Sequence, residues 1–463
     1  MEGNANSIGQ IQEQHDHNKY YVPSFFRINL GHIADFADIS NIPFGVFSAF
    51  LHEYVHFLQD ITTLYGLMVL GNTTYYIRDV ASRLSGKKGG FTVPKKLSNS
   101  RRDFGYSNSI LEKLYKGELI KPMRNNVKIL SYEIKHCSID YPKLESVVVN
   151  CRDNTEEPFS FLFGGNILTE GMAYMIQRLC YDSVYVKEGV PLLDLSDYPY
   201  MIDYYIANTI YPELAVYKEL IIGIADISLL TYNPGLTFVR FMEKLRDEKF
   251  LEKYTEENMH LIIDDLYDKG HKFVNWSLDR FKQVQDNTFA QMTEYFKMPI
   301  ASELNDWVQK MWNQAFKLRE LAPHYILDLI LANNGDVRTN QIFISIYRGI
   351  GTPLIINGDN EGFISPPQGF APSADFMPGF MWAVDEISRI FSKQEIAVPC
   401  QLYDYCNQSS RDHETTNPYL RQTKTDDRCK QNPWIRALDD NALCPVAAIW
   451  RHWNLKDCYP EWQ

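Results

Sequence analysis

Residues 50–60 read FLHEYVHFLQD, and this stretch places two histidines four positions apart. On an α-helix, positions i and i+4 lie on one face, so His52 and His56 can reach the same metal ion. Glu53 lies about 100° further round such a helix. There it would lie beside a metal-bound water, where a carboxylate acts as a general base. The stretch therefore predicts a helix that carries a metal site and its catalytic base.

The flanking sequence predicts that this helix is buried. We expect it to run from residue 43 to about 60, with Pro43 in its first turn, and a second helix to run from about 62 into the low 80s. Small and polar residues form one stripe at helical spacing, and the other positions are almost wholly apolar. The stripe consists of Gly45, Ala49, His52, Glu53, His56 and Asp60. A buried histidine or glutamate needs a partner, which a metal ion supplies. The alternative is a buried helix in which the two histidines have a purely structural role.

The sequence AFLHEYVHFL (49–58) resembles the extended signature of the zincin metallopeptidases, in which uncharged residues flank and fill His-Glu-x-x-His and an apolar residue closes it. The resemblance implies a zinc-dependent hydrolase with His52 and His56 as ligands and Glu53 as general base. The metzincin branch would place a further histidine soon after His56, but FLQDITTLYGL contains none. The third ligand must therefore come from another part of the chain.

The best candidate for the third ligand is Glu170, in NILTEGMAYMIQRL (166–179). This segment resembles the glutamate helix of the gluzincins, where a zinc-ligating glutamate is followed three positions later by a small residue, here Ala173. The helix is otherwise apolar, and an acid in such a helix is costly without a partner. Gly171 lowers helix propensity, which is easier to accept if the backbone approaches another group closely. The alternative is a first-turn glutamate favoured by the helix dipole.

Four further residues are candidates for supporting roles. Asp60 lies one turn beyond the second histidine, like the aspartate at the matching position in thermolysin-like enzymes, and we expect it to support a ligand rather than bind zinc itself. Asp226, in an apolar helix, could likewise accept the second N–H of a ligand histidine; the alternative is an ordinary buried acid. Tyr174, one turn after the glutamate, and His324, in LAPHYILDL, are candidates for oxyanion stabilisation.

Composition excludes several functional classes. The net charge of −12 argues against a nucleic-acid binder, which needs clustered Lys and Arg. The most apolar longer run, LAVYKELIIGIADISLL (214–230), carries three charged residues and is too short to span a bilayer, so we expect no membrane span. The polar first twenty residues lack the features of a secretory signal. Together with the dispersed cysteines, this predicts a cytoplasmic protein with reduced thiols.

The C-terminal region contains five of the eight cysteines, without any C-x2-C pair. These cysteines are Cys400, Cys406, Cys429, Cys444 and Cys458, with His413 and His452 nearby. We expect them to be buried and to behave as small apolar residues. A second, structural zinc site at these cysteines is the alternative.

The whole sequence predicts a predominantly helical α+β fold. We expect a zincin-like domain over 1–334, with a small sheet, the active-site helix, the glutamate helix and an insertion at about 85–165, followed by a C-terminal α/β subdomain over 335–463. Three stretches are typical of strands: VKILSYEIKHCSIDY, LESVVVNC and FSFLFGG. The expected function is a gluzincin-like metallopeptidase that hydrolyses a protein or peptide substrate. The alternatives are a non-proteolytic binding or regulatory protein on a zincin scaffold and a metallohydrolase of a non-peptide amide or ester.

Overall fold

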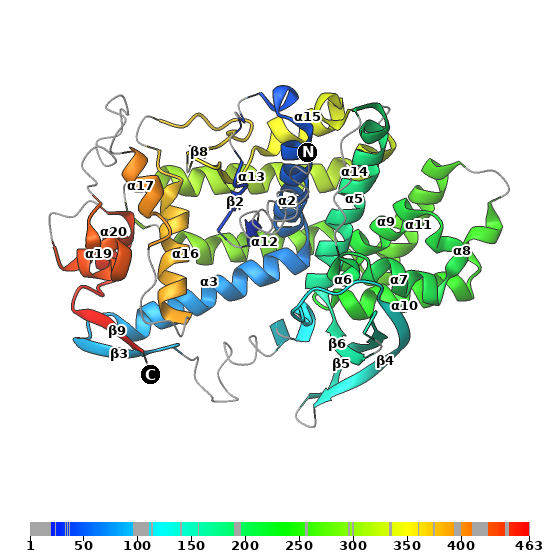
Figure 1. Cartoon of the computed structure of the whole chain (residues 1–463), viewed down its shortest axis with the longest axis horizontal. Helices are drawn as coiled ribbons and strands as arrows, with labels where there is room; N and C mark the ends of the chain where they lie inside the picture. Colours follow the sequence, from blue (N-terminus) through cyan, green and yellow to red (C-terminus); the bar gives the residue numbers. More distant parts are fainter. Residues whose placement is uncertain are drawn as a thin grey trace, which may run out of the picture.

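The computed structural model describes an α+β chain in which helices predominate (Figure 1). It covers residues 20–95, 111–188, 196–392 and 400–462, apart from positions 24, 33, 35, 37, 113, 139–140, 156, 255–257, 295–296, 299–300, 333–335, 360, 374–375, 410–424 and 440–443. Within that part of the chain, none of the helices combines the length and apolar character needed to cross a lipid bilayer.

Two consecutive long helices, α2 (Phe44–Thr62) and α3 (Leu64–Leu84), form the centre of the molecule. They confirm the helices predicted from 43 to about 60 and from about 62 to the low 80s. Thr63 separates them, and its hydroxyl accepts a hydrogen bond from the backbone N–H of Gly66, which caps the start of α3. The apolar faces of α2 are buried, as predicted, and Tyr54 and its aromatic neighbours pack against helix α15 (Gln341–Ile350).

The first sheet joins distant parts of the chain. Its strand order is β1 (Tyr20–Val22), β2 (Arg27–Asn29), β7 (Leu354–Ile356) and β8 (Gly362–Phe363), so β1 lies at an edge. Strands β1 and β2 form an antiparallel pair, and β2 then pairs in parallel with β7. The sheet therefore combines strands from both sides of the boundary predicted near 335.

The expected insertion at about 85–165 contains two kinds of strand pairing. Strand β3 (Gly89–Val93) pairs in parallel with β9 (Cys458–Trp462), near the end of the chain. Strands β4 (Lys128–Ser138), β5 (Tyr141–Arg152) and β6 (Pro158–Phe163) form an antiparallel sheet, which confirms the three predicted strands. Helix α5 (Gly165–Glu188) begins almost directly after β6 and packs against α2.

The remaining elements are mostly helices that surround α2, α3 and α5 (Figure 1). Those between α5 and α15 are α6 (Asp197–Tyr200), α7 (Ile202–Ile210), α8 (Pro212–Ala215), α9 (Lys218–Leu229), α10 (Pro234–Asp247), α11 (Met259–Val274), α12 (Leu278–Thr293), α13 (Ser302–Leu321) and α14 (Tyr325–Leu331). Short 3-10 helices lie at Ile39–Asn41, Phe250–Lys253 and Val337–Thr339. The C-terminal elements are α16 (Gly379–Ser392), α17 (Tyr403–Ser409), α19 (Asp427–Gln431), the 3-10 helix η6 (Pro433–Leu438) and α20 (Pro445–His452). These C-terminal helices gather beside the far end of α3, away from α5.

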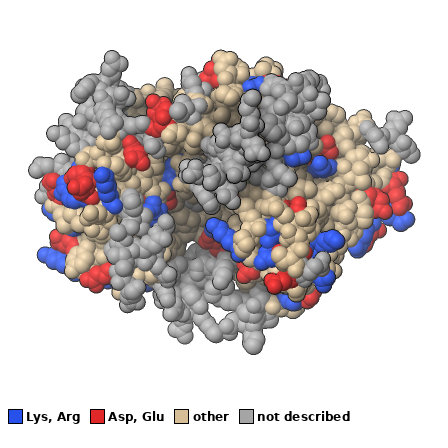
Figure 2. Space-filling model, viewed as in Figure 1, with Lys and Arg blue, Asp and Glu red and all other residues tan. Residues whose placement is uncertain are grey.

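Charged side chains of both signs are interspersed on the face of the molecule shown in Figure 2. Lys and Arg lie next to Asp and Glu there, although the chain carries a net charge of −12. A surface that tracks a phosphate backbone would instead show Lys and Arg clustered together.

Candidate metal centre

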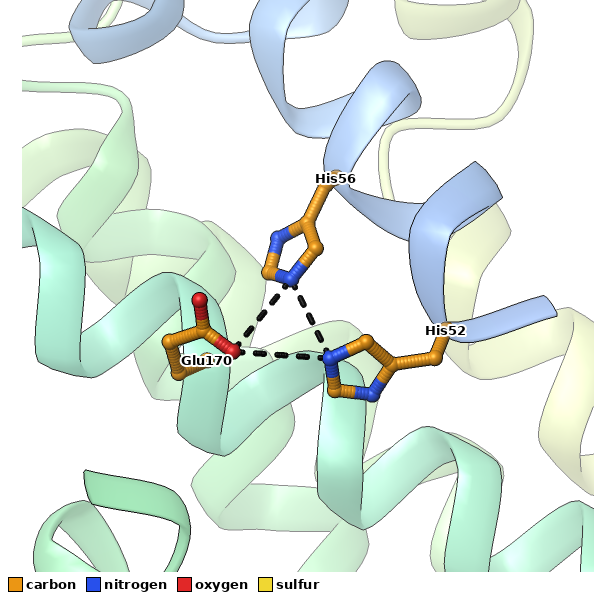
Figure 3. Close-up of side chains that lie close together, drawn as sticks. All are labelled: His52, His56 and Glu170. Carbon is orange, nitrogen blue, oxygen red and sulfur yellow. Dashed lines mark hydrogen bonds and ion pairs between the residues drawn. The ribbon is translucent and has the colours of Figure 1, made fainter. Parts of the chain in front are cut away.

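Three side chains from two helices converge at one point (Figure 3). His52 and His56 extend from α2, and Glu170 extends from α5. The Nε2 atoms of the two histidines lie 3.2 Å apart, and Oε2 of Glu170 lies 3.4 Å from Nε2 of His52 and 3.5 Å from Nε2 of His56. The structure thus brings together the three residues that were predicted as ligands, although Glu170 is far from the histidines in sequence.

The spacing of these three atoms suits a zinc ion. Tetrahedral zinc with nitrogen and oxygen ligands at about 2.0–2.1 Å requires neighbouring ligand atoms about 3.3–3.4 Å apart. The measured separations of 3.2, 3.4 and 3.5 Å match this requirement closely. Among the described residues, this is the one group of His, Cys, Asp or Glu with three ligand atoms within 4.8 Å of one another. Two imidazoles and a carboxylate also form a common ligand set of catalytic zinc.

Gln59 orients His56 from behind the site. Its side-chain oxygen lies 2.9 Å from Nδ1 of His56 and accepts a hydrogen bond from it. Its side-chain nitrogen donates to the carbonyl of Thr169 at 3.2 Å. Because this hydrogen bond keeps a proton on Nδ1 of His56, Nε2 is the ring nitrogen that would bind a metal ion. Gln59 therefore fixes the ring and also ties α2 to the residue that precedes the third ligand, a role that the sequence analysis missed.

Glu170 supplies negative charge to the two imidazoles. Burial lowers the pKa of His56, but the charge and hydrogen bond of Glu170, aided by Glu53 and Gln59, outweigh burial and raise that pKa to about 9. Burial raises the pKa of Glu170 in turn, yet His56 and then His52 hold it well below its usual range. The group therefore stabilises a positive charge between its three members, whether a proton or a metal ion carries that charge.

Strand β1 holds Glu53 and Asp60. The backbone N–H of Tyr21 donates to Oε2 of Glu53 at 2.7 Å, and the hydroxyl of Tyr21 donates to Oδ2 of Asp60 at 2.9 Å. Asp60 was expected to support a ligand histidine, but Gln59 occupies that position on His56. The structure instead connects Asp60 to Glu53 through Tyr21. The base predicted from the sequence thus lies beside the ligands, with one carboxylate oxygen oriented by the edge strand.

A close approach at Gly171 was expected, and the approaching group is Asp203 on α7. A Cβ atom at position 171 would overlap the carboxyl group of Asp203, so a larger residue there would have to displace that carboxyl. Asp203 is fully buried; its Oδ1 accepts from the N–H of Tyr204 at 2.8 Å, whereas its Oδ2 has no hydrogen-bond partner. Burial raises the pKa of Asp203 to about 8. A protonated carboxyl therefore packs directly beside the residue that follows Glu170, and no local sequence signal indicated it.

A cleft of about 290 Å³ opens over the three ligands. It is lined by His52, Glu53, His56 and Glu170, by Tyr20 and Tyr21 of β1 and by Pro23, which follows β1. The other lining residues are Gln59, Asp60, Tyr65, Val69, Lys116, Leu119, Asn166, Thr169 and Tyr200. Residues of the edge strand and of helix α5 thus line the same cleft as the candidate ligands.

Neither residue proposed for oxyanion stabilisation lines this cleft. The ring of Tyr174 is buried against the ring of Tyr200 at a centroid distance of 5.6 Å. His324 lies elsewhere, with its two nitrogens 3.0 Å from Asp328 and 3.2 Å from Asp264. Tyr200 is the residue that reaches the cleft, with its ring edge-on to His52 at 6.0 Å. No local sequence signal indicates Tyr200, because only the packing of α6 against α5 places it there.

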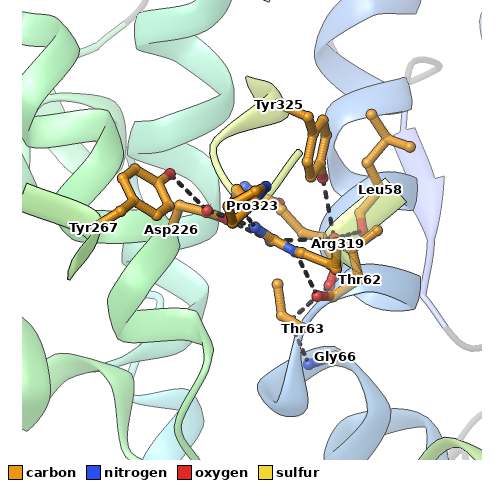
Figure 4. A network of polar contacts seen from close by, with 10 residues as sticks. Leu58, Thr62, Thr63, Gly66, Asp226, Tyr267, Arg319, Pro323 and Tyr325 are labelled. Atoms are coloured by element: carbon orange, nitrogen blue, oxygen red, sulfur yellow. Dashed lines mark hydrogen bonds and ion pairs between the residues drawn. The ribbon is translucent and has the colours of Figure 1, made fainter. Parts of the chain in front are cut away.

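Asp226 does not support a ligand histidine; it forms a buried ion pair (Figure 4). Both of its carboxylate oxygens accept from Arg319, at 2.6 and 2.7 Å, and Tyr267 donates to it at 2.8 Å. Nε of Arg319 also donates to the backbone carbonyl of Thr62, the last residue of α2, at 2.9 Å. Asp226 is thus the ordinary buried acid of the alternative reading, and through Arg319 it holds the end of the ligand-bearing helix.

Comparison with known protein families, with functionally characterised proteins and with solved structures finds no match for this chain. The interpretation of the site therefore depends on its own geometry.

Proposed function

We propose that this chain is a zinc metallopeptidase, with His52, His56 and Glu170 as the zinc ligands and Glu53 as the general base. The observation that carries the proposal is the triangle of ligand atoms, whose sides of 3.2, 3.4 and 3.5 Å suit tetrahedral zinc. The His-Glu-x-x-His motif on one helix also places Glu53 directly after the first histidine, where the general base of zinc hydrolases with this motif lies. The small sheet with its edge strand β1, the helix α2 and the helix α5 further support a zincin-like core of gluzincin type.

Zinc bound by these three residues would supply a Lewis acid that lowers the pKa of a coordinated water and polarises a substrate carbonyl. Glu53 would accept the proton of the attacking water and deliver it to the leaving nitrogen. The backbone N–H of Tyr21 holds Oε2 of Glu53 at 2.7 Å, so the carboxylate keeps its orientation while its other oxygen exchanges the proton. Gln59 keeps the ring of His56 in the tautomer that binds a metal through Nε2.

We propose Tyr200 as the group that stabilises the negative charge on the substrate oxygen. It lines the same cleft as the ligands, and its ring lies edge-on to His52, whereas Tyr174 and His324 do not line the cleft. A hydroxyl donor at this position would stabilise the developing oxyanion. A protein or peptide segment that lies along β1 would bring its carbonyl between Tyr200 and Glu53.

The cysteines support a reducing compartment such as the cytoplasm. Seven of them are described, and all are buried free thiols: Cys151, Cys180, Cys400, Cys406, Cys429, Cys444 and Cys458. Disulfides are typical of oxidising compartments, whereas free buried cysteines are typical of cytosolic proteins.

The first experiment measures zinc per chain by elemental analysis in the wild type and in the single variants His56→Ala and Glu170→Ala. We expect each variant to hold about one zinc ion fewer than the wild type. Asp60→Asn is the matched control, because Asp60 lines the same cleft but contacts Tyr21, and we expect it to keep the full zinc content. Equal zinc in the wild type and both ligand variants would refute the metal site.

The second experiment tests the reaction. Wild type and Glu53→Gln are incubated separately with a complex protein extract, and new peptide N-termini are identified by mass spectrometry. We expect cleavage products in the wild-type sample that are absent from the Glu53→Gln sample, while both proteins hold the same amount of zinc. Identical products in both samples would exclude Glu53 as the base.

Two other functions remain as outcomes of the same assays. If zinc is bound but no peptide bond is cut, a panel of small amides and esters tests a metallohydrolase of non-peptide substrates. Hydrolysis of one of these amides or esters by the wild type but not by Glu53→Gln would replace the peptidase proposal. If neither kind of substrate is hydrolysed, the chain is a non-proteolytic binding or regulatory protein on this scaffold.

A further inference from the structure

An apolar groove of about 780 Å³ lies between helices α13, α14 and α15. It shares no lining residue with the cleft over the candidate metal ligands. Its large apolar lining residues include Leu318, Leu321, Tyr325, Leu331, Ile342 and Ile346. Leu321 is 81 % exposed, more than any other large apolar side chain in the described part of the chain. A groove of this size with an exposed apolar border is typical of a binding site.

The groove has the length of a short helix. Residues of α15 line it from Gln341 to Ile350, the first and last residues of that helix, so this wall is about 13 Å long. A second wall is formed by α13 from Gln314 to Leu321, and the side chain of Gln314 donates to the carbonyl of Gln368 at 3.3 Å. A partner helix of two to three turns matches walls of this length, and such helix-in-groove binding is a recurring mode of recognition.

The walls of the groove are fixed from the side that faces α2. The ring of Tyr54 on α2 packs on Tyr347 of α15 at a centroid distance of 6.0 Å, and its hydroxyl donates to the carbonyl of Gly351 at 2.8 Å. Tyr325 lines the groove, and its hydroxyl lies 3.1 Å from the hydroxyl of Thr62 at the end of α2. These contacts are buried. The groove is therefore formed before any partner binds, which lowers the entropic cost of binding.

Three exposed basic residues border the groove: Lys310, Lys317 and Arg348. Lys317 lines it directly, Lys310 lies two turns earlier on the same side of α13, and Arg348 lies two turns after Gln341 on α15. None of these three side chains forms an ion pair within the described residues. The one acid among the lining residues, Asp328, lies 3.0 Å from Nδ1 of His324. Uncompensated positive charge along both walls favours a partner with acidic residues.

We propose that this groove binds an amphipathic helix of a partner protein, with apolar residues on one face and acidic residues along the borders of that face. Apolar side chains at helical spacing would contact Leu318, Leu321 and Ile346, as the anchors of a groove-bound helix do. Acidic side chains on either side would lie near Lys317 and Arg348. A nucleic acid would provide the negative charge without the apolar face, and a flat lipid surface would not fill a concave groove.

The test selects helical peptides against the full-length wild type. A phage-displayed library carries Leu at positions i, i+4 and i+7, and the flanking positions vary among Glu, Lys and Gln. We expect enrichment of peptides with Glu at the flanking positions. The affinity of a synthetic copy of an enriched peptide is then measured by fluorescence anisotropy. Failure to enrich any peptide, or enrichment of Lys over Glu, would overturn the proposal.

A variant of the exposed apolar border locates the binding site. Leu321→Asp should weaken binding of the enriched peptide by about tenfold or more, because it removes an apolar contact and adds a charge of the same sign as the peptide. Val216→Asp is the matched control, since Val216 is 75 % exposed but does not line the groove. It should bind the peptide as the wild type does. Equal affinities of Leu321→Asp and the wild type would refute the assignment.

Reversing the charge of the borders tests the acidic character of the partner. When the library is selected against Lys317→Glu/Arg348→Glu, we expect Lys to replace Glu at the flanking positions. Lys128→Glu, at an exposed lysine of β4, should keep the preference of the wild type for Glu. An unchanged preference for Glu in the double variant would contradict the proposal. None of these measurements requires zinc or hydrolysis, so failure of the proposed function leaves their result unchanged.

Two other occupants are tested without peptide. Sedimentation velocity compares the oligomeric state of the wild type with that of Leu321→Asp, and we expect no difference. A wild-type dimer that Leu321→Asp dissociates would replace the partner helix with a second copy of this chain. Flotation with vesicles of anionic phospholipid tests a lipid surface. Binding of the wild type to these vesicles that is lost in Leu321→Asp would likewise overturn the proposal.

Discussion

The side-chain oxygen of Gln59 accepts a hydrogen bond from Nδ1 of His56 at 2.9 Å, and the same side chain donates to the carbonyl of Thr169 at 3.2 Å. One amide therefore sets the tautomer of a proposed zinc ligand and also links the two helices that carry the candidate ligands. Removing a hydrogen-bond partner of a metal ligand typically lowers metal affinity by about 10- to 100-fold.

Gln59→Leu should weaken zinc binding by about 10- to 100-fold while the protein remains folded. Leucine keeps most of the volume of glutamine but removes both hydrogen bonds, so His56 can rotate and lose its tautomeric preference. The measurement is competition for zinc with a chelator of known affinity. Asp60→Asn serves as the control, because the Asp60 carboxylate binds Tyr21, and its zinc affinity should match the wild type. Equal affinities for all three proteins would show that Gln59 has no such role.

Tyr200→Phe should lower kcat by about 100-fold or more with little change in KM, because the hydroxyl acts only on the oxyanion of the transition state. The measurement uses a substrate identified in the cleavage assay, together with the zinc content of the variant, which should equal that of the wild type. Tyr174→Phe is the control: that ring packs on Tyr200 but does not line the cleft. Equal losses in the two variants would point to a packing defect rather than to oxyanion stabilisation.

Arg319→Met should destabilise the protein by about 3–5 kcal/mol, because it leaves Asp226 charged and buried without its partner. The double variant Arg319→Met/Asp226→Leu should recover much of this loss, because neither charge then remains buried. The measurement is the free energy of unfolding from urea denaturation. For comparison, Arg246→Met removes a partner from an ion pair with Asp247 in which both side chains are exposed. It should cost no more than about 1 kcal/mol. A double variant less stable than Arg319→Met would contradict this account.

Asp203→Asn should change how stability depends on pH. The carboxyl ionises near its ordinary pKa of 3.8 in the unfolded chain, but burial raises its pKa to about 8 in the folded protein. Between these values the folded state holds a proton that the unfolded state has released, so rising pH destabilises the wild type by up to about 1.4 kcal/mol per pH unit. Asparagine does not ionise. The variant should therefore gain stability relative to the wild type from about pH 4 to about pH 8.

This comparison is made on metal-free protein by thermal unfolding at a series of pH values, so that zinc binding adds no pH dependence of its own. The stability difference between Asp203→Asn and the wild type should grow steadily with pH. A difference that stays constant over this range would mean that Asp203 is ionised in the folded protein, and the explanation given for the buried, unpaired Oδ2 would be wrong.

The candidate site shows which kinds of residue can be predicted from sequence. His52, Glu53 and His56 were predictable because their relation is local: helical periodicity alone places them on neighbouring faces of one helix. Glu170 was predictable because an acid in an apolar helix needs a partner, although only the packing of α5 on α2 showed which partner it has. Asp60 was predicted to support a ligand, whereas in the structure Gln59 contacts His56. The two lie about 100° apart on the helix, and the approach of Thr169 decides between them.

The sequence by itself determined helices α2 and α3, the strands of the β4–β5–β6 sheet and the candidate ligands of the proposed metal site, because each depends on periodicity or on the chemistry of a short segment. Only the tertiary structure decided the partners that act across long sequence distances: Tyr200 at the cleft, Asp203 against Gly171, and Arg319 on Asp226. Such contacts depend on how helices and strands pack in space, and the spacing of residues along the chain does not encode that directly.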